Sequence, residues 1–181
     1  MNIQDDILED ADMLETGIGK QNVGNAGEYY IASRLSAKNF ITTLTLGRAE
    51  KYDILAVNPT GKTIKLSVKT RYKKTDRFIL SKKDEIGGLD DFYYAFICLN
   101  EFKSEPQFWI IPSKQVNEII TRQTTDYFGK VNQDGGKRTD VGIRNLWLKL
   151  GKQDTITYPA DWEEKLKTYE GNIDQLTGEK L

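Results

Sequence analysis

The stretch YDILAVNPTGKTIKLSVKTR, residues 52–71, decides the fold. Apolar side chains alternate with polar ones over lengths typical of strands, and the second half is rich in β-branched and aliphatic residues. Between the two halves lies Asn58-Pro59-Thr60-Gly61, a typical turn sequence. We therefore expect a β-hairpin of strands 52–58 and 63–70, in which the numbers of paired residues sum to about 120–122.

That register brings charged side chains together at the open end of the hairpin. Asp53 lies opposite the end of the second strand, where Ser67 and Lys69 share the polar face. A lysine in a central strand needs a partner, because its ammonium group is rarely buried alone. The simpler interpretation is a cross-strand ion pair between Asp53 and Lys69, which adds little stability if it is exposed.

A second carboxylate is predicted to face the core from the preceding helix, expected over residues 26–38. Glu28, Ile31, Ala32 and Leu35 follow the spacing of one helical face, so Glu28 shares the apolar stripe. The alternative is that Glu28 lies in the first helical turn, where it favours the helix dipole and reaches water. Together, Glu28, Asp53 and Lys69 indicate a cation site.

Basic residues surround this proposed site, although the net charge of the chain is only −1. Residues 1–19 contain six acids and no base, whereas residues 62–83 contain nine bases and a single acid, Asp76. The middle of the chain is therefore suited to binding a polyanion, with aromatic residues among the bases available for stacking. The alternative is a solvated surface loop. The bases predicted to contact nucleic acid are Arg48, Lys51, Arg71, Lys73, Lys74 and Arg77.

The composition excludes several classes of chemistry and location. The chain has no histidine, so catalytic triads and histidine-ligated metal sites are excluded. The one cysteine, Cys98, has no intramolecular partner, which suits a reducing compartment. No apolar run is long enough to span a membrane, and the acidic start lacks the features of a secretory signal. We expect a cytoplasmic protein that makes no membrane contact.

The order of predicted elements favours an α/β domain around a mixed central sheet flanked by helices. We expect three parts: an acidic helix and linker over 1–22, a core over 23–128, and a loop and helix that pack on the core over 129–181. In the third part, Gly135 to Arg138 form a second basic patch. Besides the hairpin and the helix 26–38, the expected elements are helix 3–16, a glycine-rich linker 16–25, strands 40–47, 92–100 and 106–113, a short helix 81–86, helix 113–124 and a terminal helix that begins near Pro159.

The helix with GEYY, the strand that opens KYDILAV and the strand that ends LSVKTR together resemble the PD-(D/E)xK nuclease superfamily, the restriction-endonuclease-like fold. The resemblance implies an α-β-β-β-α-β core and a site for Mg²⁺ or Mn²⁺. By this resemblance Glu28, Asp53 and the carbonyl of Val68 are metal ligands, and Lys69 is the catalytic lysine. The third acid of the motif falls at Ser67, which makes the motif a degenerate SxK, and Glu28 or Glu50 would have to supply the missing charge.

The resemblance predicts a metal-dependent hydrolase of nucleic-acid phosphodiesters, with DNA as the expected substrate. Ser67 would then hydrogen-bond a metal-bound water, and a homodimer is one arrangement that the resemblance implies. Two alternatives remain open. One is a non-catalytic module of this fold that binds nucleic acid or a protein partner, and the other is an immunity or antitoxin-like protein whose acidic start binds a basic partner.

Overall fold

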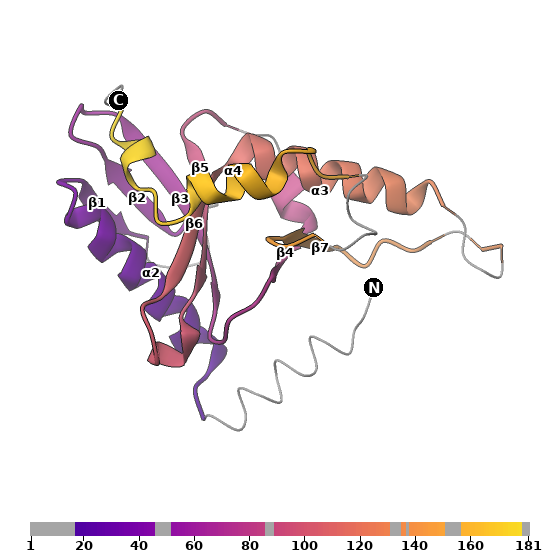
Figure 1. Cartoon of the computed structure of the whole chain (residues 1–181), viewed down its shortest axis with the longest axis horizontal. Helices are drawn as coiled ribbons and strands as arrows, with labels where there is room; N and C mark the ends of the chain where they lie inside the picture. Colours follow the sequence, from indigo (N-terminus) through magenta and orange to yellow (C-terminus); the bar gives the residue numbers. More distant parts are fainter. Residues whose placement is uncertain are drawn as a thin grey trace.

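A five-stranded mixed sheet in the order β1-β2-β3-β5-β6 organises the chain (Figure 1). The computed structural model describes residues 17–45, 52–85, 89–130, 135–136, 138–150 and 157–178, so the helix predicted over 3–16 lies outside the described residues. The predicted α/β class with a mixed, helix-flanked sheet is confirmed. The elements are α2 (Lys20–Ser36), β1 (Ile41–Leu44), β2 (Ile54–Val57), β3 (Thr63–Arg71), β4 (Arg77–Ser81), the 3₁₀ turn η1 (Lys82–Glu85), β5 (Phe92–Cys98), η2 (Asn100–Phe102), β6 (Gln107–Pro112), α3 (Ser113–Phe128), β7 (Ile143–Trp147), α4 (Trp162–Tyr169) and η3 (Asp174–Leu176).

The predicted hairpin forms the centre of the sheet. β2 and β3 are antiparallel, with Ile54 opposite Leu66 and Val57 opposite Thr63, so the numbers of paired residues sum to 120 as predicted. β3 then pairs in parallel with β5, which places Ser67 beside Tyr94 and Lys69 beside Phe96. Because side chains alternate between faces along a strand, Ser67, Lys69, Tyr94 and Phe96 share one face of the sheet.

The sheet is covered on both faces, as Figure 1 shows. α2 packs on the face that carries Leu66 and Ile97, whereas α3, α4, β4 and β7 pack on the face that carries Phe96. The C-terminal segment reaches both faces, because Trp162 of α4 is buried on the second face and Leu176 of η3 on the first. Burial on both faces explains why β5 and β6 read as nearly continuous apolar runs in the sequence.

The helix α2 begins earlier than its predicted start at residue 26. It starts at Lys20, so the predicted glycine-rich linker 16–25 is wrong from Lys20 onward. Val23 is buried and extends the stripe of Gly27, Ile31 and Leu35 by one turn. Packing of this stripe outweighs the low helix propensity of the glycines, which costs about 1 kcal/mol for each one in a helix interior.

The connection between β3 and β5 differs from the helix that the resemblance implies. Its described residues form the strand β4 and the 3₁₀ turn η1 and contain no α-helix. β4, which was not among the predicted strands, pairs with β7 to form a separate two-stranded sheet. Phe78 and Leu80 of β4 and Leu146 of β7 are buried, and this burial drives the pairing of segments far apart in the sequence.

Among the described helices, none combines the length and the apolar character that crossing a membrane requires.

Candidate functional site

Asp53 lies immediately before β2, and its carboxylate is held against the neighbouring strand β3. The Oδ2 atom accepts a hydrogen bond from the backbone N–H of Val68 at 2.6 Å and one from the Ser67 hydroxyl at 3.3 Å. The Asp53 backbone N–H also donates to the Leu66 carbonyl at 2.8 Å. These bonds fix the carboxylate at the point where β2 begins, against the part of β3 that extends beyond β2.

Glu28 approaches Asp53 from α2, the helix that packs on the face of the sheet that carries Leu66 and Ile97. Partial burial raises the pKa of its carboxyl group, and the negative charge of Asp53 raises that pKa further. The coupling arises because α2 packs closely on β3, where Gly27 contacts the side chain of Thr70. The structure thus brings Glu28 and Asp53 within electrostatic reach of each other, although they lie on different elements.

Lys69 has a different partner from the one expected in the simpler interpretation. Its ammonium nitrogen lies 3.7 Å from Oδ1 of Asp84 on η1, and no ion pair with Asp53 occurs among the described residues. The same Oδ1 accepts a hydrogen bond from the Tyr94 hydroxyl at 2.9 Å. The reason is geometric: Asp53 is already bonded to β3, whereas η1 carries Asp84 over the face on which Lys69 lies.

Asp84 is a site residue that was not predicted from the sequence, although a local signal for its position exists. Ser81-Lys82-Lys83-Asp84 has the spacing of a capping box, and Asp84 Oδ2 accepts hydrogen bonds from the Ser81 N–H at 2.7 Å and the Ser81 hydroxyl at 2.9 Å. This pattern predicts a turn that begins at Ser81. It does not predict the contact with Lys69, which depends on the path of the chain between β3 and β5.

The oxygen donors around Asp53 are of the chemical type that a small hard cation binds. Leu66 directs its carbonyl toward β2, so by strand alternation Val68 directs its carbonyl to the same side, beyond the first paired residue of β2. The donor set is then two carboxylates and one carbonyl. Within the described residues, no three acidic or cysteine side chains form a metal-binding cluster. Two carboxylates nevertheless suffice for Mg²⁺, which commonly completes its shell with water and substrate phosphates.

The predicted nucleic-acid contacts fall partly outside the described residues, as Arg48, Lys51 and the candidate acid Glu50 do. Arg71 is the last residue of β3, and Lys73 and Lys74 follow it in the connection to β4. Arg77 begins β4, with its guanidinium 5.5 Å from the centre of the Trp147 ring. Lys74 lines a cavity of about 360 Å³ together with residues of β6 and α4, which are not the elements that hold Asp53.

The neighbour of Asp84, Glu85, belongs to a second network of charges on the same turn. Its Oε1 accepts hydrogen bonds from Arg144 Nε and from the Thr124 hydroxyl, the latter at 2.8 Å. The Arg144 guanidinium, which is only 6% exposed, also donates two bonds to the Asp140 carboxylate, at 2.9 and 3.1 Å. These contacts hold the pKa values of the Glu85 and Asp140 carboxyl groups below their usual ranges. The turn η1 therefore links the Lys69 region to β7.

Comparison with known proteins gives no family assignment. No protein-family model matches the chain, and no curated protein matches it. Among solved structures, the chain is similar to the bacterial homing endonuclease I-Ssp6803I, with 15% sequence identity and a TM-score of 0.40 over 83% of this chain and 94% of that chain. So distant a likeness carries no argument about function, and the proposal below therefore rests on the site itself.

Proposed function

We propose that this chain is a metal-dependent nuclease that hydrolyses phosphodiester bonds, with DNA as its substrate. One observation carries the proposal: Asp53, fixed on β3 by Val68 and Ser67, lies close enough to Glu28 to raise its pKa. Two carboxylates that repel each other gain from a cation bound between them. β3 also carries Lys69, the residue directly after Val68, and a phosphate group bound at this site would need such a positive charge.

Each residue of the site has a defined part in this proposal. Asp53, Glu28 and the Val68 carbonyl would hold Mg²⁺ or Mn²⁺, which when bound stabilises charge on the phosphate and lowers the pKa of a coordinated water. Ser67 donates to Asp53 and so orients a ligand, and its hydroxyl is also predicted to contact coordinated water. Lys69, 29% exposed at its side chain, would exchange its contact with Asp84 for the substrate phosphate.

The first test is a calorimetric titration of Mn²⁺ and Mg²⁺ into the wild-type protein and the Asp53→Asn variant, with and without a short DNA duplex. The variant keeps an oxygen to accept the Val68 N–H bond but lacks the charge. Loss of a residue that only supports a metal ligand typically costs 10- to 100-fold in affinity, so loss of a ligand should cost more than about tenfold. Glu118→Gln, which neutralises an exposed acid of α3, is the matched control and should bind as the wild type does.

Failure of the wild type to bind either metal, with or without DNA, would overturn the catalytic proposal. One observation favours the second candidate, a non-catalytic module of the same fold that binds nucleic acid: the position expected to hold a third acid is Ser67, which is 5% exposed and bonded to Asp53. That candidate requires DNA binding that a chelator leaves unchanged.

A further inference from the structure

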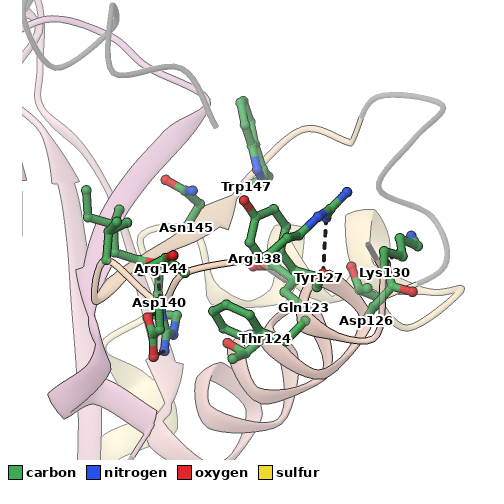
Figure 2. A pocket seen from close by; sticks show the side chains of 15 residues that line it. Gln123, Thr124, Asp126, Tyr127, Lys130, Arg138, Asp140, Arg144, Asn145 and Trp147 are labelled. Atoms are coloured by element: carbon green, nitrogen blue, oxygen red, sulfur yellow. Dashed lines mark hydrogen bonds and ion pairs between the residues drawn. The ribbon is translucent and has the colours of Figure 1, made fainter. Parts of the chain in front are cut away.

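A cavity of about 390 Å³ lies between the last turns of α3 and the strand β7, and nothing in the proposed metal site uses it. Figure 2 shows Gln123, Thr124 and Tyr127 of α3 on one side and Asn145 and Trp147 of β7 on the other. This volume falls within the range of small-molecule sites and is suited to one nucleotide rather than a duplex. Arg144 also lines the cavity, and its ion pair with Glu85 links the cavity to η1, the turn that carries Asp84.

The walls of the cavity offer aromatic surface that the fold leaves exposed. Tyr127 and Phe128, at the end of α3, are 37% and 36% exposed, and both line the cavity with Trp147. Their two rings are nearly perpendicular, with centroids 5.2 Å apart, so the edge of one ring meets one face of the other and the remaining faces stay uncovered by this contact. Exposed aromatic residues in a concave site are suited to a planar ring that stacks on them.

The charges of the cavity leave one cation without a carboxylate partner among the described residues. Three bases and two acids line it, and Lys130 pairs with Asp126 at 2.6 Å while Arg144 pairs with Asp140. The fifth charged residue, Arg138, donates to the Tyr127 carbonyl at 3.1 Å and lies 4.2 Å from the centre of the Tyr127 ring. A guanidinium held in this way keeps donors available for an anion such as phosphate.

A hydrogen-bonding group of the cavity also lacks a partner. The side-chain carbonyl oxygen of Asn145 is buried and accepts no hydrogen bond from any described residue. An unsatisfied buried acceptor costs stability, so rotation of the Asn145 amide toward a ligand that donates an N–H is favoured. The edge of a nucleobase supplies such donors, and asparagine pairs well with the adenine edge, which offers an amino donor beside a ring-nitrogen acceptor.

From these features we infer that the cavity binds a single unstacked nucleotide, with its base against Trp147 and the face of Tyr127 that Arg138 leaves open, its edge on Asn145 and its phosphate on Arg138. Adenine is the base that this arrangement fits best. The same chemistry is offered by a free nucleotide and by one base of a single strand. The inference that this nucleotide is part of a nucleic-acid substrate rests on the proposed nuclease function. The inference that the cavity binds a nucleotide does not depend on that function.

The test is a calorimetric titration of the full-length protein, in EDTA, with adenosine 5′-monophosphate, adenosine, inorganic phosphate and a short adenine-rich single strand. EDTA separates this site from the proposed metal site, so binding here is independent of the nuclease proposal. We expect the monophosphate to bind more tightly than adenosine or phosphate. Tighter binding of the strand than of the monophosphate would identify a nucleic acid as the source, and the reverse would identify a free nucleotide.

Two variants of the cavity and one control complete the experiment. Asn145→Leu removes the hydrogen-bonding edge and Arg138→Gln removes the charge, and each should weaken binding of the monophosphate about threefold to tenfold, the effect of one lost hydrogen bond. Arg122→Gln changes an exposed arginine of α3 that does not line the cavity, so it should bind as the wild type does. The inference is overturned if the wild type binds no monophosphate at millimolar concentration, if phosphate alone binds equally well, or if both cavity variants bind unchanged.

Discussion

Glu28 is a carboxylate whose environment disfavours its charge. Burial and the neighbouring Asp53 raise its pKa above the ordinary value of 4.5. Between pH 4.5 and the raised pKa, the folded protein therefore holds a proton that the unfolded chain has lost. The stability contributed by that proton is complete below this window and is lost as the pH rises through it. Above the window the two neighbouring carboxylates are a cost to the fold, which is expected where a site is built for a ligand rather than for stability.

We therefore expect Glu28→Gln to raise the melting temperature of the protein at pH 7 in EDTA. The gain should shrink as the pH falls through the window and vanish below pH 4.5, where Glu28 is protonated in both states. Thermal unfolding followed by circular dichroism between pH 4 and 7 measures it. Glu118→Gln, at an exposed position of α3, is the control for loss of one negative charge. In saturating Mn²⁺ the wild type should instead melt at a higher temperature than Glu28→Gln, because only the wild type keeps both carboxylates.

A gain that persists at pH 4 would show that the Glu28→Gln substitution stabilises the helix by some route other than charge. No gain at neutral pH would show that Glu28 and Asp53 do not repel each other in solution. Either result would remove the observation that carries the nuclease proposal.

At the scale of elements, the approach of α2 to β3 decides whether Glu28 reaches Asp53. Gly27 makes this approach possible, because an added methyl group at that position would lie 2.0 Å from Thr70 Oγ1 and 2.8 Å from Thr70 Cγ2. Gly24, one turn earlier on the same helix, has no atom within 4 Å of the corresponding position. The two glycines thus serve different purposes: Gly27 is required by packing and Gly24 is not.

Substitution of each glycine by alanine separates these roles. Gly27→Ala should destabilise the protein by about 1–3 kcal/mol, the usual cost of overpacking, despite the better helix propensity of alanine. Gly24→Ala should stabilise it by about 0.5–1 kcal/mol, because the alanine restricts the unfolded chain and contacts nothing. Urea unfolding measures both free energies of unfolding. Gly27→Ala should also weaken Mn²⁺ binding, since the helix must shift away from β3, whereas Gly24→Ala should leave it unchanged.

Equal effects of the two substitutions would mean that α2 does not pack on β3 as the structure has it. A destabilised Gly27→Ala protein with unchanged metal affinity would instead separate the packing of α2 from the metal site, and Glu28 would not be a ligand.

Elements that depend on residues close together in the sequence could be predicted, whereas elements that depend on residues far apart in the sequence could not. The register of β2 and β3 was predictable, because the Asn58-Pro59-Thr60-Gly61 turn and the alternation of apolar residues are local signals. The contact of Lys69 with Asp84 was not, because it depends on β4 pairing with β7 more than sixty residues along the chain. The start of α2 was missed for the same reason: the burial of Val23, a tertiary effect, outweighs the glycines.

For the whole molecule, the arrangement of charge matters more than its sum. With 26 basic and 27 acidic residues, the chain has no long-range attraction for a polyanion. Any binding of DNA must therefore depend on a local surface, and the predicted contacts among the described residues are Arg71, Lys73, Lys74 and Arg77. Local phosphate contacts make the affinity depend on the salt concentration, because each contact releases a counterion from the DNA.

We expect the affinity for a short DNA duplex to fall as salt rises, with a slope of log K against log salt of about −3.6 for four phosphate contacts at about −0.9 each. This corresponds to a loss of roughly a hundredfold between about 50 and 200 mM salt. Lys74→Gln should reduce the magnitude of the slope by about 1, because it removes one of the four contacts. Lys38→Gln, which neutralises a lysine paired with Asp174 at the end of α2, should leave the slope unchanged. Fluorescence anisotropy with a labelled duplex in EDTA measures all three proteins. A slope near zero, or the same slope in Lys74→Gln as in the wild type, would show that the segment after β3 does not contact phosphates, and the polyanion would then have to bind elsewhere or not at all.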